Sequence, residues 1–150
     1  MWLLLLLAVA VVIQRSSFES NSADAGGAIA IYGPLVQIKE CNFVRNTAAS
    51  LNGGAVYVFG PTQETLRGGF SLNKGVCMVI SSSQFTDNVG SAGGAIYIFN
   101  ATALNISNVQ LVGNVAKWGG GMCVEEGALG RCWPWERTCL PNENIWVAHF

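Results

Sequence analysis

Side chains that could carry out acid–base or metal chemistry are few in this chain and do not cluster. The single histidine, His149, stands one residue before the end, and the two aspartates, Asp24 and Asp87, lie far apart. Glu125 and Glu126 form the one adjacent acidic pair. The five cysteines show neither a C-x-x-C spacing nor a nearby histidine, which is not the pattern of a zinc site. We therefore expect no catalytic residue, no metal site and no cofactor, and predict that the chain is not an enzyme.

The composition favours a folded chain with many turns. Hydrophobic residues make up 51% of the 150 residues and charged residues 11%, against about 25% charged in an average domain. Intrinsic disorder needs the opposite balance, so that class is excluded. A net charge of −1 offers no basic surface for nucleic acid. The 18 glycines show no every-third-residue spacing, so they indicate tight turns rather than collagen.

An internal repeat organises most of the chain. Each copy holds the pattern Phe-x-x-Asn, followed by a Gly-Gly pair, and the Phe (or Leu) positions are spaced by 25, 42 and 26 residues. The repeated positions are Phe18, Asn21, Gly26 and Gly27; Phe43, Asn46, Gly53 and Gly54; Phe85, Asn88, Gly93 and Gly94; and Leu111, Asn114, Gly119 and Gly120.

Two short runs in each copy alternate apolar and polar residues. Val36 and Ile38 precede one Phe, and Val56 and Val58 follow the next Gly-Gly pair. A period of two predicts strands, and no stretch shows a convincing helical period. Short strands in copies of about 25 residues predict an all-β solenoid, a parallel β-helix of about four coils stacked about 4.8 Å apart.

Each repeated residue has an expected structural role in such a coil. The Phe column should point inward and stack on its copies in the neighbouring coils. The Asn column should lie at a corner, because Asn tolerates left-handed backbone and its stacked amides can bond to one another. The Gly-Gly pair should supply a positive φ and close packing without a Cβ atom.

The repeat resembles that of the chlamydial polymorphic outer-membrane proteins, which carry many copies of Gly-Gly-Ala-(Ile/Leu/Val) and Phe-x-x-Asn. The first motif stands at Gly26, Gly53 and Gly93 and becomes Gly-Gly-Gly-Met at Gly119; the second becomes Leu-Val-Gly-Asn at Leu111. The resemblance covers residues 11 to about 124. It implies a right-handed β-helix of the pectin-lyase-like kind on a secreted or surface-displayed protein with adhesin-like roles.

Three segments depart from the repeat. Residues 1–10 are apolar and suit either a signal peptide or a cap. Residues 61–75 form an inserted loop within the β-helix repeats of residues 11–124, and its charged residues Glu64, Arg67 and Lys74 make it a candidate binding loop. Residues 125–150 are rich in Cys and Trp, which suits a cap on the solenoid or the start of a further coil.

Two further kinds of covalent site follow from the residue types. Cys123 falls in a column opposite in phase to the apolar one, so we expect it to face outward and to form a disulfide with Cys132 or Cys139. The sequons at Asn100 and Asn105 are candidate N-glycosylation sites if the chain passes through a eukaryotic secretory route.

Charged residues also align between neighbouring copies. Arg15 falls beside Glu40, and Arg45 falls near Asp87. We expect two surface ion pairs there, and exposed pairs of that kind contribute about 0–1 kcal/mol.

These observations favour a non-catalytic β-helix scaffold, secreted or associated with a cell surface or outer membrane, with an adhesin-like binding role. Its expected partner is an unidentified glycan or protein, not nucleic acid, and no transmembrane span is expected. The repeat pattern suggests a fragment that continues into further repeats of a longer protein. The alternative is a polysaccharide-active lyase, hydrolase or epimerase whose active site is absent or degenerate here, since such enzymes need clustered carboxylates.

Overall fold

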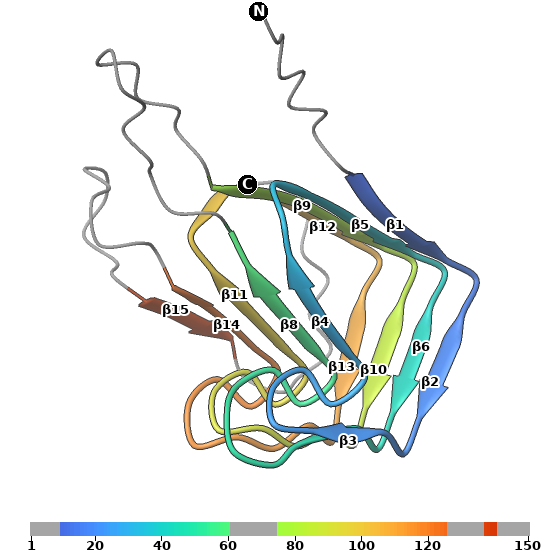
Figure 1. Cartoon of the computed structure of the whole chain (residues 1–150). Coiled ribbons are helices and arrows are strands. Elements are labelled where there is room, and N and C mark those ends of the chain that lie inside the picture. The colour runs from blue at the N-terminus through green and yellow to red at the C-terminus, as the bar shows by residue number, and fades with distance from the viewer. Residues whose placement is uncertain (1–9, 61–74, 126–136, 141–150) are drawn as a thin grey trace, which may run out of the picture.

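The chain folds entirely into β-strands over the part that its structure describes. A computed structural model places residues 10–60, 75–125 and 137–140, the last four by their backbone. Every regular element in these ranges is a strand (Figure 1). Within the same ranges no helix is long and apolar enough to cross a membrane. The all-β prediction is therefore confirmed.

The strands form three larger sheets, each built from successive copies of the repeat (Figure 1). The first sheet contains β1 (Ala10–Gln14), β5 (Leu35–Lys39), β9 (Val76–Ser81) and β12 (Ala101–Ser107). The second contains β2 (Ser17–Glu19), β6 (Asn42–Val44), β10 (Gln84–Thr86) and β13 (Gln110–Val112). The third contains β4 (Ile29–Tyr32), β8 (Val56–Phe59), β11 (Ile96–Phe99), β14 (Met122–Glu125) and β15 (Arg137–Leu140). A small fourth sheet pairs β3 (Ser22–Ala23) with β7 (Thr47–Ala48).

The strand register reproduces the alignment of the sequence copies. Ile38 pairs with Ile13 on one side and with Ile80 on the other, all in parallel strands. Phe43 pairs in the same way with Phe18 and Phe85. Because equivalent residues of successive copies are direct neighbours, the arrangement is consistent with a β-solenoid.

One hydrophobic core joins the three sheets. The alternating apolar residues of each sheet enter the same cluster, including Val36, Ile38, Val56 and Val58, each 0% exposed. In the first copy the equivalent residues Val11, Ile13 and Ile29 are only partly buried, because among the described residues no further copy covers that side. The fourth equivalent, Ile31, is buried at 8% exposed. The inward direction predicted for these columns is confirmed.

A stack of phenylalanine rings runs through this core. The Phe18 and Phe43 ring centroids lie 4.9 Å apart, and those of Phe43 and Phe85 lie 4.6 Å apart, with nearly parallel planes. Leu111 continues the column and is 2% exposed. This spacing is the strand spacing of a parallel sheet, so strand pairing sets the ring stacking.

The asparagines form a buried amide ladder beside the second sheet. The Asn46 backbone N–H and Nδ2 both donate to Asn88 Oδ1, at 2.9 and 3.0 Å. The Asn88 N–H and Nδ2 donate in the same way to Asn114 Oδ1, at 3.0 and 2.8 Å. Asn21 repeats the pattern toward Asn46 at the exposed end. The predicted stacking of the Asn side chains is confirmed.

The left-handed corners do not fall on the asparagines, which corrects one expectation. The residue before each Asn has the positive φ instead: Ser20, Arg45, Asp87 and Gly113. The Asn that follows lies outside that region and directs its amide to the next copy. A second left-handed column lies between the first and second sheets, at Arg15, Glu40, Ser82 and Asn108.

The Gly-Gly pair is required for two separate reasons, as predicted. The first glycine has a positive φ in each copy, 57° at Gly26 and 68° at Gly53. The second has no room for a side chain, because a Cβ at Gly54 would lie 1.9 Å from the Gly94 carbonyl oxygen.

Candidate binding site

The side of the third sheet that faces away from the main core carries a series of aromatic residues. Strand alternation that sends Val56 and Val58 inward sends Tyr57 and Phe59 to the opposite side. The parallel register then aligns these residues with their copies in β4, β11 and β14. The outer side of the sheet therefore carries two parallel rows of side chains. The row that we call the inner row contains Ala30, Tyr57, Tyr97 and Cys123. The row that we call the edge row contains Tyr32, Phe59, Phe99 and Glu125.

The rings of both rows stack along the sheet. In the edge row the ring centroids of Tyr32 and Phe59 are 5.1 Å apart, and those of Phe59 and Phe99 are 4.7 Å apart. In the inner row Tyr57 and Tyr97 are 5.5 Å apart. Offset stacking at such distances is the favoured geometry of aromatic pairs.

Tyr32 at the first strand is the part of this surface most available to a partner. Tyr32 is 70% exposed, whereas Phe59 and Phe99 are partly buried. A ring in the middle of a stack has both faces covered by its neighbours, so only its edge is exposed. Among the described residues Tyr32 stacks on one ring only, that of Phe59.

Toward β14 the inner row is buried and contacts a carboxyl group. Tyr97 is 4% exposed, and its hydroxyl donates to a carboxyl oxygen of Glu125. Burial raises the pKa of Tyr97 well above its usual range, and the hydrogen bond to Glu125 raises it further. Burial, with a smaller effect of Glu125, also raises the pKa of Tyr57. The Tyr97 phenol therefore stays protonated well above neutral pH and keeps donating to Glu125.

The prediction that Cys123 faces away from the main core is confirmed, but the prediction that it is exposed is wrong. Cys123 lies outside the main core, as its phase indicated, but it is 0% exposed. Ala92 and Tyr97 pack with it in a second small cluster, and Tyr57 and Phe99 lie against this cluster. No disulfide joins Cys123 to Cys41 or Cys77.

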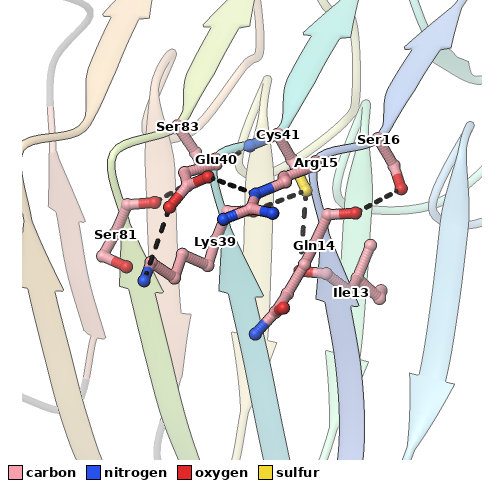
Figure 2. A network of polar contacts seen from close by, with 9 residues as sticks. All are labelled: Ile13, Gln14, Arg15, Ser16, Lys39, Glu40, Cys41, Ser81 and Ser83. Carbon is pink, nitrogen blue, oxygen red and sulfur yellow. Dashed lines mark hydrogen bonds and ion pairs between the residues drawn. The ribbon is translucent and has the colours of Figure 1, made fainter.

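A second group of polar side chains lies at the corner after the first sheet (Figure 2). Arg15 Nε donates to Glu40 Oε2 at 2.8 Å, and Lys39 Nζ lies 3.4 Å from Glu40 Oε1. Beneath them the Cys41 thiol donates to the carbonyl oxygens of Lys39 and Ile13, at 3.2 and 3.6 Å. These bonds join the turn between β1 and β2 to the turn between β5 and β6.

The predicted pair of Arg15 and Glu40 is thus confirmed, and the pair of Arg45 with Asp87 is not. Arg45 donates to Glu19 Oε1 on β2 instead. Both Arg45 and Glu19 are exposed, so the pair adds little to stability.

We expect Arg15→Ala to raise the pKa of Glu40 toward its usual value. The Arg15 guanidinium holds that pKa below its usual range, and Lys39 contributes less, so the return should be incomplete. Because the folded pKa is lowered, the pair's contribution to stability is present above the usual Glu pKa and is lost as the pH falls through the folded value. Carboxyl NMR titration measures the shift. Arg45→Ala is the control and should leave Glu40 unchanged; an unchanged Glu40 in Arg15→Ala would contradict the assignment.

The remaining predicted sites are only partly placed. The loop residues Glu64, Arg67 and Lys74, and Cys132, lie outside the described residues. Asn105 is exposed on β12, as predicted, and Asn100 is partly buried with a positive φ. The use of either sequon stays a prediction.

Acidic groups of the described residues do not gather around one point. Glu19 and Glu40 bond to arginines, Glu125 to Tyr97, and Asp24 accepts from the Ser50 hydroxyl. Within the described ranges no group of three or more His, Cys, Asp or Glu side chains is placed to hold a metal ion.

No family model, no curated protein and no solved structure matches this chain. The outer aromatic rows therefore stand as the candidate site on geometry alone. Sequence analysis identified the outward column that contains Cys123 but missed the edge row of Tyr32, Phe59 and Phe99. The signal was an aromatic residue at one fixed position after three of the four Gly-Gly pairs.

Proposed function

We propose that the chain is a non-catalytic scaffold that binds a glycan or protein at a cell surface through its outer aromatic rows. In this proposal the three sheets close into a right-handed parallel β-helix of about four coils, of the pectin-lyase-like kind. The protein is secreted or displayed on a cell surface or outer membrane, and it forms part of a longer repeat protein. The resemblance of the paired repeat motifs supports these points.

The observation that carries the binding role is the position of the aromatic residues. The main core uses one face of the third sheet. On the other face Tyr97 is buried in the second small cluster, whereas Tyr32 at the opposite end of the rows is 70% exposed and is not needed to fill the interior. A stacked row with an exposed terminal ring at Tyr32 offers a flat apolar surface that either a sugar ring or an apolar side chain can cover. Aromatic residues are also enriched among the residues that dominate binding energy at interfaces.

Tyr32→Ala tests the proposal. We expect this variant to lose binding to its ligand by about tenfold or more, because an aromatic contact that dominates an interface contributes about 1.4 kcal/mol or more. The measurement screens the chain on an immobilised glycan array and on intact cells, then compares affinities for the strongest ligand. Stability should change little, because Tyr32 is mostly exposed.

Val12→Ala is the matched control. Val12 is an exposed apolar residue of the same copy, 51% exposed, but it lies on the first sheet. It should bind as the parent chain does. Equal losses in both variants, or no loss in Tyr32→Ala, would refute the assigned site. Release of reducing sugars or unsaturated products from a bound polysaccharide would refute the non-catalytic role.

A further inference from the structure

The third sheet ends in a strand that runs against all the others. β14 pairs with β11 in parallel, as the earlier copies do, but β15 pairs with β14 in the antiparallel direction. The other strand pairs of the described chain are all parallel. β15 therefore does not continue the repeat; it covers the edge of β14.

The register of this pair sets two cysteines directly opposite each other. Cys123 on β14 is the partner of Cys139 on β15, between the pairs Met122 with Leu140 and Val124 with Thr138. Directly opposed residues of an antiparallel pair have Cα atoms about 4.5–5.5 Å apart. A disulfide needs Cα atoms about 4.4–6.8 Å apart, so the backbone spacing suits a bond.

The neighbouring strands offer Cys123 no other cysteine. Its partner on β11 is Tyr97. Cys77 on β9 has Leu35 and Ala103 as its partners, and the Cys41 thiol lies in the main core, donating to backbone carbonyls. Strand pairing thus selects Cys139 from the two candidates that sequence analysis left open.

We propose that Cys123 and Cys139 form a cross-strand disulfide that fastens β15 to the end of the solenoid. The oxidant is a small disulfide such as oxidised glutathione. One cysteine thiolate attacks a glutathione sulfur, giving a mixed disulfide and one reduced glutathione. The second cysteine displaces the other glutathione, so two protons and two electrons leave the protein and two reduced glutathiones form.

The burial of Cys123 sets the order of events. Since this side chain is 0% exposed in the folded chain, oxidation is expected during folding, before the second cluster closes around it. Once formed, the bond limits separation of β15 from β14. A solenoid end needs such a cover, because an open strand edge invites pairing with other chains.

The full chain, refolded in a glutathione redox buffer, provides the test. After free thiols are alkylated and the protein is digested, mass spectrometry should find the Cys123 peptide joined to the Cys139 peptide, with Cys41 alkylated. Cys132→Ser is the matched control and should keep this link. A Cys123–Cys132 link, or Cys123 recovered as an alkylated thiol, would overturn the proposal.

A second readout does not depend on variants that fold poorly. After proteolysis within residues 126–136, denaturant should release a tail fragment from the reduced protein, whereas the oxidised protein keeps that fragment attached until reductant is added. Cys139→Ser should release it under both conditions. Release from the oxidised parent chain would also overturn the link. The inference depends on strand register and not on the proposed binding role, so loss of one leaves the other standing.

Discussion

Asn88→Ala is expected to lower the free energy of unfolding by about 4 kcal/mol. Asn88 is 0% exposed and sits in the middle of the amide ladder. Its Oδ1 accepts from the backbone N–H and Nδ2 of Asn46, and its Nδ2 donates to Asn114 Oδ1 and to the Phe43 carbonyl. Alanine leaves the buried Asn46 backbone N–H without its acceptor, at a cost of about 1–3 kcal/mol, and removes three further hydrogen bonds, each worth about 0.5–1.5 kcal/mol. Together these losses account for the expected change.

Urea unfolding followed by circular dichroism measures this change, and Asn21→Ala is its control. Asn21 makes the same donor bonds to Asn46 but is exposed, so water replaces what it loses. Its loss should be about 1 kcal/mol or less. Equal losses at the two positions would mean that the ladder's stability does not come from burial of its amides.

The repeat pattern was sufficient to predict which residues stack. Phe43, Asn46 and Gly54 recur at matching positions, and any model that stacks the copies must bring each onto its equivalent in the next. The alternation beside them then decides which side chains enter the core. At these positions each side chain contacts a copy of the same residue type, so the contact can be predicted from a single sequence.

The left-handed corners could not be located in the same way. The residues with positive φ before the asparagines include Ser20, Arg45 and Asp87, which share no chemistry. Their conformation follows from the turn that joins two strands, whereas the Asn one position later is held by its ladder bonds. Residue type favours this conformation clearly at Gly113 and less strongly at Asp87, and it does not favour it at Ser20 or Arg45.

The candidate site also depended on information beyond the pattern. Phase alone predicts that Cys123 points away from the core, but its burial requires the rings of the neighbouring copies to close around it. In the same way, alignment set Arg45 near Asp87, yet the long side chain turns back to Glu19 on β2. A column gives the neighbours of a residue; it does not give the direction that a flexible side chain takes.

Gly54→Ala is expected to destabilise the chain by at least about 3 kcal/mol, and this variant tests how closely the copies pack. The new Cβ would lie 1.9 Å from the Gly94 carbonyl oxygen and 2.6 Å from the backbone of Val89. Both contacts are with backbone of the next copy, which cannot move aside as a flexible side chain can. Relief requires the two copies to separate, which would stretch the bond from the Gly54 N–H to the Gly93 carbonyl, 3.0 Å long.

Gly33→Ala separates this steric effect from the general effect of replacing a glycine. A Cβ at Gly33 meets nothing within 4 Å, and its φ lies outside the left-handed region. Alanine also narrows the conformations of the unfolded chain, so Gly33→Ala should be neutral or more stable by about 0.4–1 kcal/mol. Urea midpoints of the two variants give the comparison directly. If Gly54→Ala were as stable as Gly33→Ala, the copies would have to be spaced more widely at the Gly-Gly corner than the parallel register requires.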